Sequence, residues 1–210
     1  AVNLNDEFPT WYHNLVRYPQ AIGTTGNYIV IYSNGAATKS KLFTLDNTTI
    51  TAHSARAILI TSDDGNSSDS AAWSVNPFDA TKGMLAYRKN SNGILYLKPF
   101  TFSGSGTSMT VSSGSDEQLA TGGSISNDNQ QINLVYIDKD HFVVTAKGNS
   151  NYSYNGISYL VKYDGTTYTK SSVVNLPTNL TGTPGSENQV YNSMLSNNTT
   201  TDQFKLSWVG

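Results

Sequence analysis

The stretch that decides the fold is residues 75–113, which read VNPFDATKGMLAYRKNSNGILYLKPFTFSGSGTSMTVSS. Three apolar or alternating runs, at residues 73–77, 83–88 and 94–102, are separated by the polar turns DATKG and NSNG. A fourth run, at residues 108–112, follows a Gly-Ser-Gly turn. Short strands joined by Asn, Asp and Gly turns are typical of an antiparallel meander. We therefore predict a four-stranded sheet, the unit of a propeller blade or of one layer of a sandwich.

The same pattern recurs at residues 27–54 and at residues 141–174. Each copy has an apolar strand, a polar hairpin with Asn or Gly, an alternating strand, a turn and a strand rich in Thr or Ser. Aligning Tyr28, Met84 and Phe142 gives a period of roughly 56 residues, which is long for a propeller blade. The excess length is expected in loops.

Each core strand is preceded by a shorter lead strand, and half a unit ends the chain. The lead strands are expected at residues 11–18, 72–75 and 133–137, and the half-unit at residues 190–195 and 203–209. A closed ring removes exposed sheet edges, and terminal half-units can pair to seal it. We expect residues 1–210 to form one all-β domain, a small irregular pseudo-β-propeller of about three four-stranded repeats plus a terminal half-repeat. A β-sandwich is the alternative.

The composition suits strands and argues against several partners. Only 13% of residues are charged, and the formal net charge is −2. Arginine occurs only at Arg17, Arg56 and Arg88, so binding to nucleic acid is not expected. Cysteine is absent, which excludes disulfides and thiolate-bound metal. No apolar run is long enough for a membrane span, and the start at Ala1 without Met suggests a mature form or an excised domain.

The densest acidic cluster is residues 62–69, SDDGNSSD. Carboxylates and Asn carbonyls in a loop with Gly are the hard oxygen ligands that Ca²⁺ prefers. Asp63, Asp64 and Asp69 are therefore candidate calcium ligands. The spacing is not that of an EF-hand, and a solvated loop rich in turn-forming residues gives the same pattern.

Asp138 and Asp140 form a second acidic group, in a tight turn between a lead strand and a core strand. Asp79 and Asn198 fall at the corresponding junctions of other units. Such recurring groups either hold calcium or cap β-turns by accepting hydrogen bonds from backbone amides. Capping is the commoner role. Asp138 and Asp140 are nevertheless also candidate calcium ligands.

Residues 148–159, GNSNYSYNGISY, combine Tyr and Asn. Tyr gives rigid amphipathic contact area and Asn gives adaptable hydrogen bonds, a mixture found in binding surfaces and carbohydrate clefts. Tyr152, Tyr154 and Asn155 are therefore candidate receptor-binding residues. The alternative is a long hairpin with cross-strand Tyr pairs.

Signals for catalysis are weak, and no catalytic residue or enzyme activity is expected. The histidines, none of which has a partner at metal-ligand spacing, are His13, His53 and His141. Glycoside hydrolysis needs one carboxylic acid kept protonated in an apolar site. The glutamates, all in polar or terminal surroundings, are Glu7, Glu117 and Glu187. A glycan hydrolase remains an alternative.

The repeat, with its lead strand, Asp turn, core strand, Asn-Gly hairpin and Gly-Thr turn, resembles blade repeats in surface proteins of marine phages and marine bacteria. Over its full length the chain resembles the distal, receptor-binding domain of the vertex spike protein of marine lipid-containing corticovirus bacteriophages. The resemblance implies a pseudo-β-propeller on a pentameric spike at the virion surface. It also implies attachment to a glycan or protein receptor on a Gram-negative host, and bound Ca²⁺. A secreted bacterial lectin or adhesin domain is the alternative.

Overall fold

In the computed structural model, the described part of the chain is almost entirely strand and turn, with a single short 3-10 helix, η3 (Gly106–Ser108). The described residues are 20–33, 38–60, 71–89, 92–119, 125, 132–148, 156–175, 194–198 and 203–207. Their strands form four antiparallel sheets, none of which closes on itself.

The sheets follow one another in chain order. Sheet I contains β1 (Gln20–Ala21), β2 (Asn27–Ser33), β3 (Thr38–Asp46) and β4 (Thr49–Ile60). Sheet II contains β5 (Ala71–Val75), β6 (Lys82–Lys89), β7 (Ile94–Ser103) and β8 (Thr110–Ser113), with β9 (Glu117–Gln118) also on β7. Sheet III contains β10 (Asn133–Tyr136), β11 (His141–Lys147), β12 (Gly156–Tyr163) and β13 (Tyr168–Lys170), with β14 (Val174–Asn175) also on β12. Sheet IV contains β15 (Met194–Asn198) and β16 (Gln203–Ser207).

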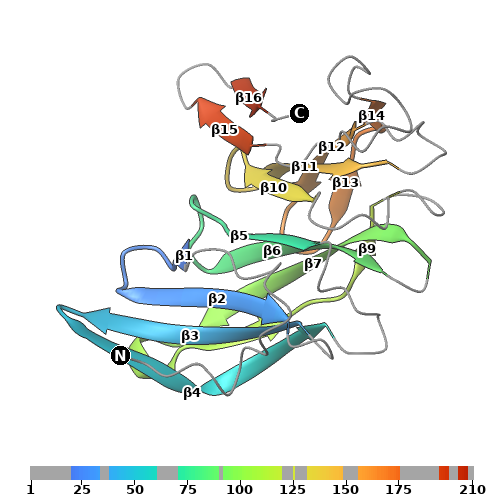
Figure 1. The fold of residues 1–210 in the computed structure, drawn as a ribbon. Coiled ribbons are helices and arrows are strands. Elements are labelled where there is room, and N and C mark those ends of the chain that lie inside the picture. Colours follow the sequence, from blue (N-terminus) through green and yellow to red (C-terminus); the bar gives the residue numbers. More distant parts are fainter. Residues whose placement is uncertain are drawn as a thin grey trace.

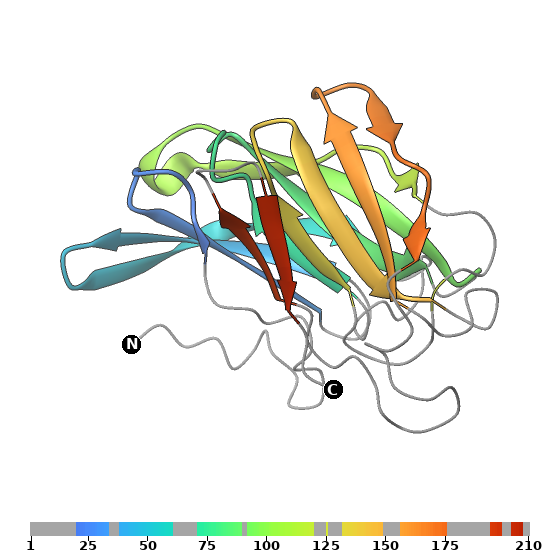
Figure 2. The same ribbon diagram turned by 90° about the horizontal axis from the view of Figure 1, so that it is seen from above.

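The four sheets are stacked, with sheet I at the bottom and sheet IV at the top of Figure 1. The first strands of the sheets are neighbours, since β5 lies against both β1 and β10, and β10 lies against β15. Seen from above, β15 and β16 run beside β10 (Figure 2). Each sheet therefore meets the next through its lead strand, and sheet II also shares a core with sheet I and another with sheet III.

Sheet II is buried on both faces, which explains why residues 83–87 read as a continuous apolar run. Leu85 and Tyr87 belong to the core shared with sheet I, where Trp73 is 1% exposed. Met84 and Ala86 belong to the core shared with sheet III. Because successive side chains of a strand point to opposite faces, one strand serves both cores.

Hydrogen bonds at the first turns of sheets I, II and III show which residues of the three repeats are equivalent. The amide of Ile22 donates to Asn27, that of Asn76 to Lys82 and that of Ile137 to His141. The residues that follow Asn27, Lys82 and His141 are Tyr28, Gly83 and Phe142, and each faces the lead strand. Gly83, and not Met84 as predicted, is thus the equivalent of Tyr28 and Phe142.

The one-residue error has a steric cause. Gly83 pairs with Phe100 on β7, and a Cβ at Gly83 would overlap the Phe100 ring. In sheet II the large side chain at this place therefore comes from the neighbouring strand. Matching a bulky residue in each repeat selects Met84 instead of Gly83. Because neighbouring residues of a strand point to opposite faces, this shift of one residue matches side chains on opposite faces of the sheet.

The predicted all-β class and the four-stranded meander are confirmed. The fourth run starts at Thr110, later than predicted, because residues 106–108 form η3. The terminal half-unit is the hairpin β15–β16, with its first strand at Met194–Asn198 and not at residues 190–195.

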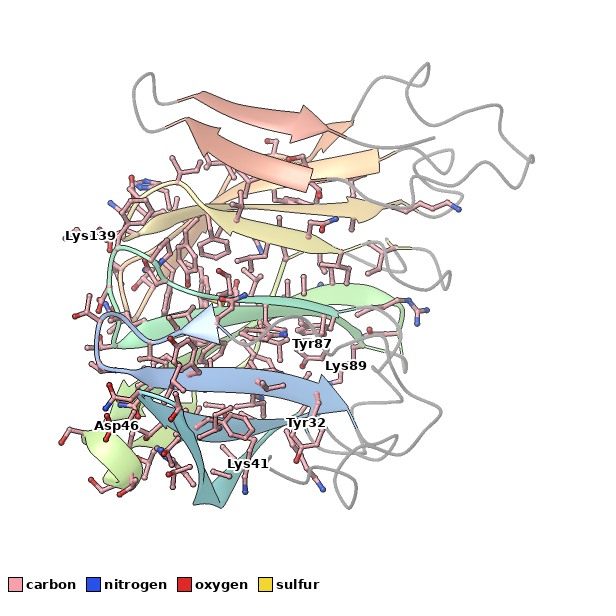
Figure 3. All side chains as sticks on the ribbon, turned by 60° about the vertical axis from the view of Figure 1, so that its left-hand side comes forward. Tyr32, Lys41, Asp46, Tyr87, Lys89 and Lys139 are labelled. Atoms are coloured by element: carbon pink, nitrogen blue, oxygen red, sulfur yellow. The ribbon has the colours of Figure 1, made fainter. Side chains whose placement is uncertain are left out.

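The stack has two distinct edges, which we name the turn edge and the loop edge. At the turn edge lie the short turns β1–β2, β3–β4, β5–β6, β7–β8, β10–β11 and β12–β13. At the loop edge, β4 ends at Ile60 and β5 starts at Ala71, and β11 and β12 are joined there. Figure 3 places Lys139 and Asp46 at the turn edge, and Tyr32 and Lys89 toward the loop edge.

Candidate ligand cleft at the turn edge

A cleft opens at the turn edge between sheets II and III, and we name it the edge cleft. Its volume is about 40 Å³, and its polar lining includes Asn76, Lys82, Tyr136, Lys139, Asp140 and Tyr163. These residues come from two turns and three strands, on both sides of the interface between the sheets. A volume of this size holds two or three water molecules, or one small polar group of a larger ligand.

Asn76 ties the two walls of the cleft together. Its side chain is 2% exposed, and Nδ2 donates to the carbonyl of Lys139 at 2.7 Å. Its Oδ1 accepts from the amides of Phe78 and Asp79 at 2.9 and 3.2 Å, which fixes the β5–β6 turn. Asn side chains are suited to such turns because they hydrogen-bond to backbone amides two or three residues on. The turn of sheet II is thereby held directly against the turn of sheet III.

Tyr136, the last residue of β10, lines the cleft. It is 6% exposed, and its ring packs against Phe142, its cross-strand partner, with ring centres 5.5 Å apart. Burial, with the nearby Asp79 and Tyr163 adding to it, raises the pKa of Tyr136 well above the ordinary value. The hydroxyl is therefore protonated at neutral pH, and no residue in the described ranges forms a hydrogen bond with it.

Charged pairs of opposite sign stand on both sides of the cleft. Lys82 Nζ lies 3.2 Å from Asp79 Oδ2, and Lys139 Nζ lies 3.6 Å from Asp140 Oδ2. The hydroxyl of Thr81 donates to Asp79 at 2.6 Å. That hydrogen bond is the main reason that the pKa of Asp79 is lowered, and it outweighs the opposite effect of burial. The cleft therefore offers donors and acceptors without a net charge.

Tyr163, which lines the cleft, is one member of an aromatic pair. Tyr163 stacks on Tyr168 with ring centres 4.3 Å apart and planes 20° apart. The Tyr163 hydroxyl donates to the carbonyl of Gly165 at 2.8 Å, and Gly165 also lines the cleft. Its backbone has φ of +105°, a region that suits glycine. The Tyr163 side chain is thus held both by stacking of its ring and by the hydrogen bond of its hydroxyl.

Asp138 acts as a turn cap. Its Oδ1 accepts from the amides of Asp140 and His141 at 2.8 and 2.7 Å, and Oδ2 lies 2.8 Å from His141 Nδ1. Burial raises the pKa of Asp138, but these hydrogen bonds together lower it below the ordinary value. The capping role is present here, as it is at Asp79 and Asp164. Asp140 itself turns to the edge cleft.

The remaining sequence predictions fall partly outside the described ranges. Those outside are Asp63, Asp64, Asp69, Tyr152, Tyr154 and Asn155. Among the described residues, no group of three or more His, Asp or Glu side chains comes together that could hold a metal ion. Asp138 and Asp140 are thus near each other, and His141 is paired with Asp138 through Nδ1, but the three are not arranged as such a group.

The described histidines and glutamate all have structural contacts. His53 Nε2 lies 2.7 Å from the hydroxyl of Thr44, which donates to Asn27 Oδ1 at 2.7 Å. His141 contacts Asp138, as described above. Glu117 lies 3.5 Å from Lys170 Nζ, an ion pair between sheets II and III.

Sequence reasoning missed the edge cleft. It identified Asp79 and Asp140 as turn residues, but not Asn76, Lys82, Tyr136 and Tyr163 as neighbours. A partial signal was available, because two turns at equivalent positions of adjacent units must lie at the same edge. The pairing of sheets II and III through their faces was not visible in the sequence.

Comparison with protein-family models, with curated protein sequences and with solved structures finds no match. In the described ranges no helix is long and apolar enough to span a membrane.

Proposed function

We propose that the chain is a non-enzymatic attachment domain that binds a virion to a receptor on the surface of its bacterial host. The resemblance of the repeats to marine phage surface proteins supports this. The observation that carries the proposal is that long connections and short turns lie at opposite edges of the stack. The connections between successive sheets and the β11–β12 connection all leave from the loop edge, whereas the turn edge has short, hydrogen-bonded turns. A rigid strand scaffold that carries its long connections on one side is typical of a binding domain.

Both predicted binding segments start and end at the loop edge. Residues 61–70 join Ile60 to Ala71, and residues 149–155 join Gly148 to Gly156. The first segment contains Asp63, Asp64 and Asp69, and the second contains Tyr152, Tyr154 and Asn155. Because their strand ends share one edge, the two segments can contribute to a single receptor-binding surface.

We also propose that sheets I to IV are successive blades of an irregular, incomplete β-propeller. The neighbouring lead strands β1, β5, β10 and β15 support this, because the first strands of propeller blades surround a common axis. Burial of sheet II on both faces argues against a sandwich of two layers.

Binding to whole cells tests the attachment function. The fluorescently labelled chain is mixed with a panel of marine Gram-negative bacteria, and cell-bound fluorescence is measured. We expect saturable binding to some strains, reduced at least tenfold, about 1.4 kcal/mol, by the double substitution Tyr152→Ala and Tyr154→Ala. Asp164→Asn, at the turn edge, serves as the matched control and should bind normally. Absence of binding to every strain, or release of reducing sugar from host polysaccharide, would contradict the proposal.

Calcium is proposed as a structural ion held by residues 62–69. A ligand at 100 times its Kd adds about 2.7 kcal/mol to the free energy of unfolding, which raises the Tm of a chain of this size by roughly 5–10 °C. Melting curves in EDTA and in Ca²⁺ should differ accordingly. The difference should vanish when Asp63, Asp64 and Asp69 are replaced by Asn, and persist in Asp46→Asn. If Asp138→Asn and Asp140→Asn abolish it instead, the ion lies at the turn edge, and identical curves for the unaltered chain exclude a structural calcium.

A further inference from the structure

The edge cleft has the chemistry of a site for a hydroxyl-bearing ligand. Tyr136 lines this cleft with a hydroxyl that can both donate and accept, and no described residue forms a hydrogen bond with it. Because the hydroxyl faces the cleft and is not one of the fully buried, unpartnered polar atoms of the described residues, water can reach it. A ligand hydroxyl that enters the cleft can replace that water and form the hydrogen bond instead. The residue is 6% exposed, so the ligand must enter from the cleft mouth.

The groups at the mouth select a neutral ligand. Asp140 supplies carboxylate acceptors, and Lys82 and Lys139 supply ammonium donors. Each ammonium is already paired with a carboxylate, Lys82 at 3.2 Å from Asp79 and Lys139 at 3.6 Å from Asp140. An anion would have to compete with those carboxylates, and a cation with those ammonium groups. A hydroxyl group suits both, because it donates to Asp140 and accepts from a lysine.

The shape of the cleft limits what enters. A volume of about 40 Å³ admits a hydroxymethyl group but not a whole sugar ring. The Tyr163 ring, stacked on Tyr168, is a rigid apolar surface beside the mouth, suited to the C–H face of the ring left outside. The walls are fixed before binding, since Asn76 joins the two turns through the Lys139 carbonyl. A preformed site loses little conformational freedom when it binds.

We infer that the edge cleft between sheets II and III is a binding site for a neutral saccharide, which inserts one hydroxymethyl group between Tyr136 and Asp140. This site lies at the opposite edge from the proposed receptor-binding loops. It does not rest on the attachment function, and it would serve a secreted lectin equally well. The proposed receptor binding by the loops and the proposed saccharide binding by the cleft can therefore be confirmed or refuted separately.

Saturation-transfer NMR with methyl α-glycosides of D-glucose, D-galactose and D-mannose tests the inference. We expect signals from at least one glycoside, strongest at its C6 protons, with a millimolar Kd. Tyr136→Phe removes only the hydroxyl, and Asp140→Asn removes only the charge. Each should weaken binding at least fivefold. Tyr28→Phe and Asp46→Asn make the same chemical changes outside the cleft and should bind as the unaltered chain does.

Several results would overturn the inference. One is the absence of any signal with the three glycosides. Another is binding that survives Tyr136→Phe and Asp140→Asn, which would put the sugar elsewhere. A third is stronger binding of inorganic phosphate than of any glycoside, with NMR chemical-shift changes at Lys82 and Lys139. That result would make the cleft an anion site. A Tm of Tyr136→Phe within about 2 °C of the unaltered chain confirms that the variant folds.

Discussion

The interface between sheets I and II and the interface between sheets II and III differ at the turn edge. Between sheets I and II, the edge is closed. Gln20 on β1 accepts from the amide of Val75 at 2.7 Å and donates to the carbonyl of Trp73 at 3.4 Å. A Cβ at Gly23 would lie 2.7 Å from the Cβ of Ala80, so the two turns are in direct contact.

Between sheets II and III, the edge is open. The equivalent of Val75 is Tyr136, since each pairs with the first facing residue of its core strand, Gly83 or Phe142. Tyr136 belongs to the core and also lines the edge cleft, and the Asn76 side chain donates across the cleft to the Lys139 carbonyl. The first edge is thus closed by the Gln20 hydrogen bonds and by the contact of Gly23 with Ala80, whereas the second carries Tyr136 where the first carries Val75.

Loss of a large core side chain should have the largest effect in either interface. Trp73→Ala, in the first interface, and Phe142→Ala, in the second, should each lower the free energy of unfolding by about 3–5 kcal/mol. Both residues are buried, at 1% and 0% exposed. Urea unfolding followed by circular dichroism measures this, with the exposed Phe78→Ala as control. If Phe142→Ala leaves a transition of unchanged midpoint, the two interfaces do not unfold together.

Removal of the two hydrogen bonds between Gln20 and β5 should open the interface between sheets I and II at the turn edge, with a moderate loss of stability. Gln20→Ala deletes both hydrogen bonds to β5 and should lower the free energy of unfolding by about 1–2 kcal/mol. Hydrogen exchange of the Val75 amide, which loses its acceptor, should become faster. Unchanged exchange at Val75 would show that these hydrogen bonds do not close this edge.

Tyr136→Phe should change stability by less than about 1 kcal/mol in either direction, because the hydroxyl has no hydrogen-bond partner among the described residues. The matched variant Tyr159→Phe, in the same core, removes a hydroxyl from a residue that does have an interaction. Thermal unfolding compares the two. A loss above about 2 kcal/mol for Tyr136→Phe would mean that the hydroxyl already has a strong partner.

The smallest effect concerns pH at the β12–β13 turn. Hydrogen bonds from the amides of Thr167 and Thr166 lower the pKa of Asp164 from 3.8 to about 2. A lowered pKa in the folded state means stability that is complete above the ordinary value and lost as pH falls toward 2. Asp164→Asn should therefore melt slightly below the unaltered chain at pH 7, with the gap closing between about pH 4 and pH 2. A difference in Tm between the two chains that does not change with pH would contradict the lowered pKa of Asp164.

Much of the fold could be predicted because it is local. Turn residues such as Asp79 and the Asn-Gly pair at Asn92 and Gly93 determine where strands end, through side-chain hydrogen bonds and a positive φ. The capping role considered for Asp138 followed from the same rule. The register of the repeats was missed by one residue, because Phe100 from another strand fills the space over Gly83.

The sequence by itself determined the all-β class, the four-stranded units and most turns, since these depend on side-chain alternation and turn chemistry within a few residues. Only the tertiary structure decided that the sheets stack through both faces. Stacking brings Asn76 to Lys139, 63 positions apart, and puts Tyr136 at an edge that Val75 leaves closed. The edge cleft exists because two turns from different units meet, and contacts between units leave no periodic signal in either one.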